Sequence, residues 1–248
     1  MVTRKCDEDE MTPASEFCQS DNVCQLVGAG IVPFARVINE DESANIYFLL
    51  GLEQISDTQQ TWDIFGGHIS SDHTETPEEI ASREFIEETA GLAYILNFDE
   101  ELPHQNSDQL CEILSNNQYL MKVIHNDNEN RRYVAFVTEI PFDPDLPTRF
   151  YEIRQHLIEI AKGTRNAVGD IAKHPAIIPE CVRSGNPDMP KINWAYLEKK
   201  QLQWYSKETI IKALTKQNGV LQMSGTCIKR LRNEFQIVFK KIMEQCEF

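Results

Sequence analysis

Runs of apolar residues divide the first part of the chain into short strands separated by polar turns. Residues 28–38 (GAGIVPFARVI) and 44–52 (ANIYFLLGL) are rich in β-branched and aromatic side chains, and the polar stretch 39–43 separates them. This arrangement predicts a β-hairpin. A shorter apolar run at 62–65 leads into a Gly-Gly pair, which predicts a third strand that ends where the backbone turns sharply or approaches another group closely.

The clearest helix signal begins after the polar loop at 68–76. Thr76 can cap the helix, Pro77 suits its first turn, and Glu79 completes a capping box. Small or apolar side chains then recur about every four positions, which predicts one buried face. Gly91 indicates where the helix ends. The residues of the buried face are Ala81, Phe85, Thr89 and Leu92.

Further strands and helices follow through the rest of the chain. Segment 141–192 holds many of the prolines, and strand-like sequence resumes after it, so we expect an insertion rather than a second domain. The predicted fold class is α/β or α+β, with a mixed sheet and helices on its faces. A single domain at 26–248 would follow an acidic leader at 1–25 that lacks apolar periodicity. The other predicted strands are 94–98, 119–125, 132–140 and 193–205, and the other predicted helices are 107–115, 149–162, 207–216 and 227–244.

Composition narrows the classes of function. The net charge is −15, from 39 acidic and 24 basic residues, which disfavours a protein that coats nucleic acid. A basic pocket or a metal ion could still bind a phosphate ester. The seven cysteines form no CxxC pair, which favours a reducing compartment over a disulfide framework or a zinc site. We find neither a signal peptide nor a run of about 20 apolar residues, so we expect a cytoplasmic protein without membrane contact.

Three glutamates stand on one face of the helix predicted after Pro77. Glu84, Glu87 and Glu88 are related as i, i+3 and i+4, so their carboxylates lie close together and repel one another. A bound cation would remove this repulsion, and Mg²⁺ prefers oxygen ligands of this kind together with substrate phosphates. The glycine pair before the loop allows the close approach that a carbonyl ligand such as Gly66 needs. The sequence therefore predicts a magnesium site.

Segment 66–91, GGHISSDHTETPEEIASREFIEETAG, resembles the Nudix box. The family pattern is G-x5-E-x7-R-E-U-x-E-E-x-G-U, where U is a bulky apolar residue. Glu75 and the run from Arg83 to Glu88 match its second part without a gap. A Trp-Tyr pair before the predicted helix 207–216 also fits the family. The resemblance implies a Nudix-like α/β/α sandwich with a mixed β-sheet.

The segment departs from the Nudix pattern in two places. The loop between Gly67 and Glu75 is two residues longer than the pattern, which leaves open which main-chain carbonyl is the metal ligand. Ala90 stands where the pattern has glycine, with Gly91 one position late. The second departure is expected to change only the way in which the helix ends. Neither departure touches the helix carboxylates.

The resemblance implies a reaction and a role for each candidate residue. Nudix enzymes hydrolyse nucleoside diphosphates linked to another group, or related diphosphates. Water attacks one phosphorus of the P–O–P linkage, while Mg²⁺, for which Mn²⁺ can substitute, polarises the phosphoryl oxygens. Glu84, Glu87 and Glu88 would hold the metal with the Gly66 carbonyl. The other implied roles are orientation of the loop by Arg83 and Glu75, action as base or extra ligand by Glu198, and substrate contact by Gly67 and His68.

Other interpretations are compatible with the sequence. For Glu198 an exposed strand residue is equally acceptable, Glu139 and Glu84 are weaker candidates for the base, and His68 also suits a solvated loop. Candidate substrates are ADP-ribose and other nucleotide sugars, dinucleoside polyphosphates and nucleoside triphosphates. One alternative function is removal of the RNA cap, with the insertion and the basic stretch 229–241 guiding a strand. Another is a Nudix-fold module that binds nucleotides without turnover.

Overall fold

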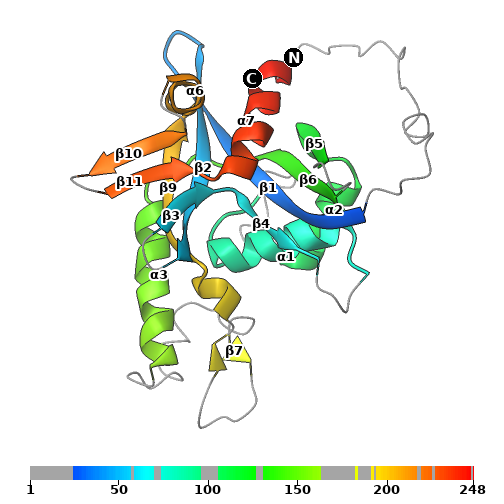
Figure 1. Cartoon of the computed structure of the whole chain (residues 1–248), viewed down its shortest axis with the longest axis vertical. Helices are drawn as coiled ribbons and strands as arrows, with labels where there is room; N and C mark the ends of the chain where they lie inside the picture. Colours follow the sequence, from blue (N-terminus) through cyan, green and yellow to red (C-terminus); the bar gives the residue numbers. More distant parts are fainter. Residues whose placement is uncertain are drawn as a thin grey trace.

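The computed structural model describes most of the predicted domain (Figure 1). The predicted leader at 1–25 lies outside it except for Gln25, as do residues 96–98 of one predicted strand and much of the predicted insertion. The described residues are 25–56, 59–69, 74–95, 106–126, 131–162, 182–183, 191–192, 194–216, 219–224, 227–246 and 248.

A nine-stranded mixed sheet forms the centre of the described part of the chain. Its main path has the order β10-β11-β3-β2-β1-β6-β5, while β4 pairs with β1 and β9 pairs with β2. The pairs β1 with β6 and β11 with β3 are parallel, and the other pairs are antiparallel. The strands are β1 (Gln25–Ile38), β2 (Ala44–Ser56), β3 (Gln59–Asp63), β4 (Phe65–His68), β5 (Met121–Asn126), β6 (Arg131–Glu139), β9 (Lys199–Ser206), β10 (Val220–Ser224) and β11 (Cys227–Leu231). A separate two-stranded sheet pairs β7 (Val182–Arg183) with β8 (Lys191–Ile192).

Within the described ranges, helices occur between and after the strands of the sheet. None of them is long and apolar enough to cross a bilayer. The short helix predicted at 107–115 and the helix predicted at 207–216 form with those bounds. The helices are α1 (Pro77–Thr89), α2 (Ser107–Ser115), α3 (Leu146–Ala161), α6 (Lys207–Lys216), α7 (Asn233–Gln245) and the 3₁₀ turn η1 (Trp194–Leu197).

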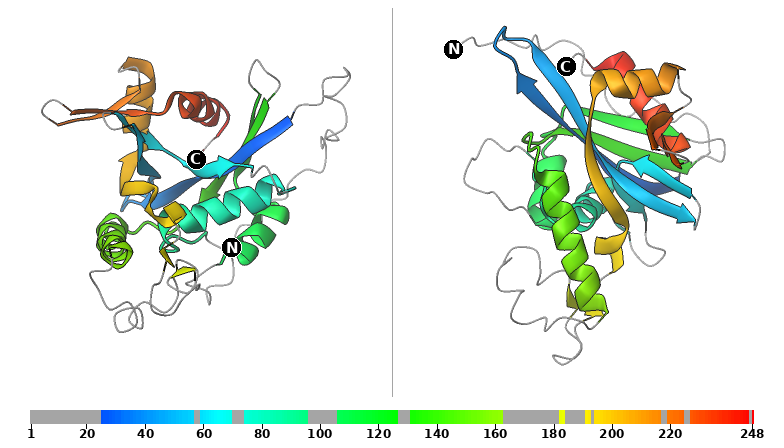
Figure 2. Two further views of the ribbon diagram at one scale, coloured as in Figure 1. Left: turned by 60° about the horizontal axis from the view of Figure 1, so that its bottom comes forward. Right: turned by 90° about the vertical axis from the view of Figure 1, so that its left-hand side faces the viewer.

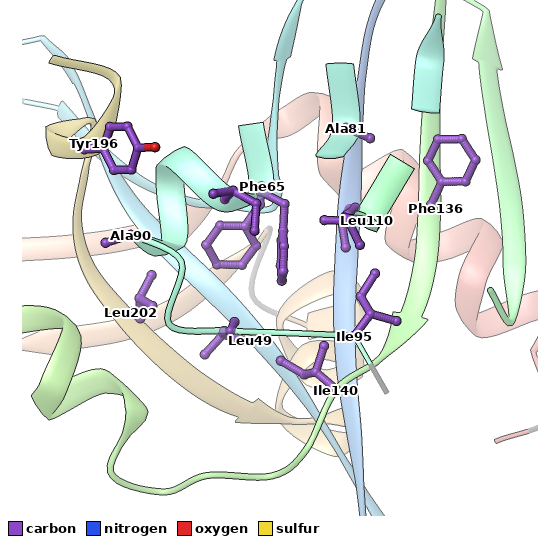
Figure 3. Packing of buried hydrophobic residues seen from close by; sticks show 14 of the residues in the cluster. Leu49, Phe65, Ala81, Ala90, Ile95, Leu110, Phe136, Ile140, Tyr196 and Leu202 are labelled. Atoms are coloured by element: carbon purple, nitrogen blue, oxygen red, sulfur yellow. The ribbon is translucent and has the colours of Figure 1, made fainter. Parts of the chain in front are cut away.

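The helices cover both faces of the sheet, and each face has its own apolar core. Helices α1, α2 and α3 lie on one side, and α6 and α7 lie on the other (Figure 2). Strand β2 supplies both cores, because successive side chains point to opposite faces. Leu49 packs in the first core with Phe65, as Figure 3 shows. Its neighbours Phe48 and Leu50 belong to the second core with Phe239. The predicted α/β/α sandwich with a mixed sheet is confirmed.

The predicted hairpin at the start of the chain forms, with longer strands than expected. Strands β1 and β2 are antiparallel, with Phe34 opposite Phe48. The apolar run at 62–65 is divided between two strands: β3 ends at Asp63, and β4 starts at Phe65 and pairs with β1. This division brings the glycine pair beside the first strand, under helix α1.

The helix predicted at 227–244 is wrong in its first part. Residues Cys227–Leu231 form strand β11, and the helix begins only at Asn233. Leu231 and Phe235 are four positions apart and both are buried, which mimics a helical stripe. Leu231 instead lies opposite Trp62 of β3, so pairing with the edge of the sheet overrides the local pattern. Strand β10, which pairs with β11, is absent from the prediction.

Two further strand predictions are wrong in part. The strand expected at 193–205 begins with the 3₁₀ turn η1, and β9 starts only at Lys199. Tyr94 and Ile95 of the strand expected at 94–98 have no regular structure, and Ile95 is buried in the core under α1. Helix α3 also starts earlier than the predicted residue 149, at Leu146.

Candidate functional site

A cavity of about 640 Å³ brings together residues that are far apart in the sequence. Six predicted site residues line it, namely Gly66, Gly67, His68, Glu84, Glu88 and Glu198. They come from strand β4, helix α1 and the bend between η1 and β9. The other predicted residues, Glu75, Arg83 and Glu87, are not among the described residues that line this cavity.

Helix α1 is capped at both ends by hydrogen bonds within its own segment. The Glu79 backbone N–H donates to Thr76 Oγ1 at 3.2 Å, and the Thr76 N–H donates to Glu79 Oε2 at 2.7 Å. The predicted capping box is therefore confirmed. At the other end Ala90 adopts the left-handed conformation with φ 53°, and its N–H donates to the carbonyl of Glu87. Alanine can replace the glycine of the pattern here at a steric cost of about 1–2 kcal/mol.

On the outer side of α1, Arg83 gathers three carboxylates. Its Nε lies 3.0 Å from Glu75 Oε1, and its Nη1 lies 2.8 Å from Glu84 Oε1 and 3.3 Å from Glu87 Oε2. Glu75 and Arg83 face a separate pocket of about 480 Å³. The geometry thus brings Arg83 to the Glu75 loop, as the sequence led us to expect. Burial raises the pKa of Glu87 above its ordinary value, and the charge of Arg83 opposes that rise.

On the inner side of α1, Glu88 is held by the strands. It is 2% exposed, and its Oε2 accepts a hydrogen bond of 2.7 Å from the Gly66 backbone N–H. Its Oε1 lies 3.0 Å from Nζ of Lys199, a lysine that is also fully buried. The same Nζ lies 3.3 Å from Glu53 Oε2. A Cβ on Gly51 would lie 2.7 Å from Cδ of Lys199, so the glycine makes room for the lysine stem.

The charged network continues from Glu53 to the C-terminal part of the chain. Arg232 Nη1 lies 3.5 Å from Glu53 Oε2 and 3.0 Å from Oδ2 of Asp63, which is 2% exposed. Burial raises the pKa of Asp63 to about 7, although the charges of Lys199 and Arg232 act to lower it. Arg232 stands between β11 and α7, so the C-terminal segment is joined to the core of the site rather than lying apart from it.

The Lys199 amine stays protonated in spite of its burial. Burial acts to lower its pKa, but the carboxylates of Glu88, Asp63 and Glu53 hold the pKa above its ordinary value. Burial also raises the pKa of Glu88 well above its usual range, and Lys199 opposes this. Lys199, Glu53, Asp63 and Arg232 are not among the site residues predicted from the sequence. One signal was available: in the lysine pair after Glu198, strand alternation requires that one side chain point inward.

The glycine pair lies in direct contact with the helix carboxylates. A Cβ on Gly67 would lie 2.1 Å from Glu84 Oε1, so no other residue fits this position without displacing that carboxylate. The N–H and C=O groups of a strand residue point to the same edge. Because the Gly66 N–H points to Glu88, its carbonyl is directed to that side as well. This direction suits the predicted role of Gly66 as a main-chain ligand.

The oxygen-rich side chains match the chemistry of Mg²⁺ or Mn²⁺. Within the described ranges, however, no group of three or more His, Cys, Asp or Glu side chains is already arranged to hold a metal ion. The reason is visible in the ion pairs: Arg83 contacts Glu84 and Glu87, and Lys199 contacts Glu88. A divalent ion would therefore take Glu84 and Glu87 from Arg83. The oxygen ligands are of the type that Mg²⁺ binds, but Glu84 and Glu87 would have to leave Arg83 before they could surround an ion.

Of the three candidates for the base, Glu84 and Glu198 line the cavity and Glu139 does not. Glu198 lines the cavity, and its pKa is raised by burial and by repulsion from Glu84 and Glu53. Glu139 lies at the end of β6, pairs with Arg36 at 3.3 Å, and is not among the described residues that line the cavity. The geometry therefore separates Glu139 from the carboxylates of α1.

The sequence matches no protein-family model and no curated protein. Solved structures are similar to it at low identity. One is a mutT/nudix family protein from Listeria innocua, at 10% identity and a TM-score of 0.37, with 89% of this chain and 92% of that chain covered. Another is an Ap4A hydrolase from C. elegans in a binary complex, at 13% identity and a TM-score of 0.36, with 88% and 96% covered.

A third similar structure is a bifunctional NMN adenylyltransferase/ADP ribose pyrophosphatase from Francisella tularensis, complexed with AMP and a Mn ion. It matches at 14% identity and a TM-score of 0.36, over 92% of this chain and 44% of that chain.

Proposed function

We propose that this chain is a Mg²⁺-dependent hydrolase of the Nudix type, which cleaves the P–O–P linkage of a nucleoside diphosphate joined to another group. The observation that supports it best is the contact between the glycine pair and the carboxylates of α1. Gly66 donates to Glu88, and Gly67 leaves just enough room for Glu84. Both lie at the wall of a cavity large enough for a small organic ligand.

The proposed metal ligands are Glu84, Glu87 and Glu88, together with the Gly66 carbonyl. The ion would polarise the phosphoryl oxygens and lower the pKa of the attacking water. Arg83 and Glu75 act by orientation: their pairing ties the loop before α1 to the helix. When Glu84 turns to the metal, Arg83 keeps Glu75 as its partner, so the loop stays attached.

Glu198 is the proposed proton acceptor or an additional ligand. Its raised pKa makes the carboxylate a stronger base than an ordinary glutamate. In the proposed step the water oxygen bonds to phosphorus, the water proton passes to Glu198, and the bond from phosphorus to the bridging oxygen breaks. The leaving phosphate keeps the electron pair of that bond.

A small, nucleotide-derived substrate suits the shape of the cavity. The wall also contains Tyr133 of β6 and Phe235 and Val238 of α7, which can pack against a planar apolar group such as a base. His68 lies at the same cavity and can contact the phosphates, as can Gly67 through its backbone. Candidate substrates are ADP-ribose and other nucleotide sugars, dinucleoside polyphosphates and nucleoside triphosphates.

The test is hydrolysis of a panel of these compounds with Mg²⁺ or Mn²⁺. We expect turnover by the unmodified chain and a loss of about 100-fold or more in kcat for Glu84→Gln and Glu87→Gln, because each variant removes a metal ligand without changing its shape. The matched control is Glu78→Gln on the same helix, whose carboxylate pairs with Lys122 at 3.0 Å outside the cavity. Equal inactivity of every variant and of the unmodified chain would reject the proposal.

A second candidate is a Nudix-fold module that binds nucleotides without turnover. The observation that favours it is the set of ion pairs that already engage Glu84, Glu87 and Glu88 with Arg83 and Lys199. Binding of a nucleotide without Mg²⁺, measured by calorimetry, together with absence of hydrolysis across the panel would support this candidate instead.

Removal of an RNA cap is the third candidate. It predicts that binding weakens steeply with added salt, because a strand contacts several basic side chains. Arg232 of the basic stretch is already paired with Asp63 and Glu53, which reduces the charge available for a strand. We therefore expect a shallow salt dependence, measured as KM for a capped oligonucleotide against ionic strength.

A further inference from the structure

Lys199 occupies an unusual place for a lysine. Its side chain is 1% exposed, and its ammonium lies 3.0 Å from Glu88 and 3.3 Å from Glu53. Lysine is almost never fully buried unless it is paired. The pairing joins strand β9 to helix α1 and to strand β2, and both of its carboxylates, Glu88 and Glu53, line the cavity.

The local charge explains why a cation is needed at this point. Four glutamates line the cavity: Glu53, Glu84, Glu88 and Glu198. Of these four, only Glu88 is fully buried, at 2% exposed, whereas the Glu53 side chain is 23% exposed. A buried carboxylate without a counter-charge costs several kcal/mol, so Glu88 must be paired, protonated or bound to a metal. Lys199 meets this need for Glu88 and also pairs with Glu53. An ammonium and a divalent ion compete for the same kind of oxygen, which makes Lys199 a substitute for a metal ion.

We propose that Lys199 is a resident cation of the site: its ammonium holds Glu88 and Glu53 where a further divalent ion would otherwise bind, so the site takes one metal ion fewer. This inference rests on the proposed function, because it assumes that a divalent ion binds at the neighbouring carboxylates.

Lys199 acts through other groups and is therefore a positioning residue. One oxygen of Glu88 faces Lys199, and the other accepts the hydrogen bond from Gly66. Fixing Glu88 in this way also fixes the strand end whose carbonyl is directed to the metal site. A mobile ion would hold Glu88 only when bound, whereas Lys199 holds it at any metal concentration.

The test counts metal ions directly. Mn²⁺ is titrated into the full chain, and free Mn²⁺ is measured by electron paramagnetic resonance. We expect Lys199→Met to bind one more Mn²⁺ per chain than the unmodified protein, with lower turnover. Lys199→Arg, which keeps the charge, should bind the unmodified number and recover part of the turnover. A purely structural lysine predicts the opposite for Lys199→Met: fewer ions or weaker binding.

Two control variants test whether a change in the number of bound Mn²⁺ ions is specific to Lys199. Lys200→Met removes the adjacent lysine of the same strand, whose Nζ donates to the neutral Gln54 at 2.6 Å, and it should leave the number of ions unchanged. The double variant Lys199→Met with Glu53→Gln removes one positive and one negative charge. It should bind the unmodified number, because the net charge of the cluster is restored. An unchanged count in the single variant Lys199→Met would overturn the inference.

If Lys199→Met fails to fold, a second measurement on the unmodified chain and on Lys199→Arg still tests the inference. Buried, hydrogen-bonded lysine ammonium groups exchange slowly enough to be seen by ¹⁵N nuclear magnetic resonance, and Lys199→Arg assigns the signal by its disappearance. We expect this signal to persist when Mg²⁺ saturates the protein. Its loss on adding Mg²⁺ would show that the metal displaces Lys199, which contradicts a resident cation.

The outcomes also separate this inference from the proposed function. If the unmodified chain binds no Mn²⁺ and hydrolyses none of the panel, the proposed function is wrong. If it binds Mn²⁺ and turns over substrate, but Lys199→Met binds the same number of ions, the proposed function stands and only the resident cation is rejected.

Discussion

The glutamates of helix α1 pair with a basic side chain on each side of the helix, and the two basic residues differ in origin and in burial. On the outer side Arg83 belongs to the helix itself, keeps 34% of its side-chain surface exposed, and pairs with carboxylates of the same segment. On the inner side Lys199 arrives from strand β9, is 1% exposed, and pairs with Glu88 and with Glu53, which is 146 residues away. The outer cluster, formed by Arg83, Glu75, Glu84 and Glu87, is local in the sequence. The inner cluster, formed by Lys199, Glu88, Glu53, Arg232 and Asp63, is long-range, and its central pair of Lys199 and Glu88 is fully buried.

Glutamates that are neighbours on helix α1 therefore lie in two different environments. Glu84 and Glu87 are 12% and 14% exposed and pair with Arg83, which is 34% exposed, so a metal can replace this cation at a smaller cost than at Glu88. Glu88, one position further along the helix, is desolvated and cannot lose its partner without a large penalty. Glu84 and Glu87 are therefore the proposed ligands that a metal can take from a cation, whereas the proposed ligand Glu88 is already held by Lys199 and Gly66.

The largest expected effect contrasts Lys199→Met with Arg83→Met in stability without metal. Lys199→Met leaves the buried Glu88 without its cation, although Glu53, which is 23% exposed, keeps Arg232 as a partner. We expect this variant to lower the free energy of unfolding by about 3–5 kcal/mol. Arg83→Met should lower it by a smaller amount, because the Arg83 side chain is 34% exposed and its three partners keep 12–19% of their side-chain surface exposed. Urea denaturation at low ionic strength measures both. Equal losses in the two variants would mean that the inner and outer clusters do not differ as described.

A smaller effect is expected from pH on the inner cluster. Burial raises the pKa of Asp63 from an ordinary value of 3.8 to about 7, with Lys199 and Arg232 acting to lower it and Glu53 acting to raise it. Between these two values the folded chain binds the Asp63 proton and the unfolded chain does not, so this group's contribution to stability is lost as pH rises. It is fully present below the unfolded pKa and gone above the folded one.

Asp63→Asn isolates that contribution. The amide of this variant can still accept a hydrogen bond from Arg232, but it does not titrate. The free energy of unfolding of the unmodified chain, relative to that of the variant, should fall by about 2 kcal/mol from about pH 5 to about pH 8. Urea denaturation across this range gives the difference. Parallel pH profiles for the two proteins would contradict the raised pKa.

The outer cluster could be predicted from the sequence because every signal for it is local. The capping box at Thr76, the i, i+3 and i+4 glutamates, and the reach of Arg83 to Glu75 all follow from helix geometry over a few turns. The strands of the first hairpin were likewise predictable from short apolar runs. Only their ends differ, since strand ends depend on which neighbours continue the hydrogen bonding.

The inner cluster could not be predicted in this way. Nothing near Lys199 in the sequence marks Glu53 or Glu88 as its partners, because the strand order of the sheet brings them together. The same cause misled the prediction at 227–244, where an apolar spacing of four suggested a helix. Strand β11 forms because the edge of β3 is open to pair with it, and this pairing also places Arg232 beside Asp63.

The smallest expected effect tests whether the start of α1 influences either cluster. Thr76→Ala removes the side-chain cap at 3.2 Å and should lower the free energy of unfolding by about 1 kcal/mol. Asn106→Ala is the matched control, since Asn106 caps α2 through an equivalent capping box and should cost a similar amount. Only Thr76→Ala should also weaken Mn²⁺ binding, by about two- to fivefold, because Glu75 adjoins the cap and Arg83 depends on it. If both variants leave Mn²⁺ affinity unchanged, the loop and the outer cluster are uncoupled, and the orienting role proposed for Glu75 is lost.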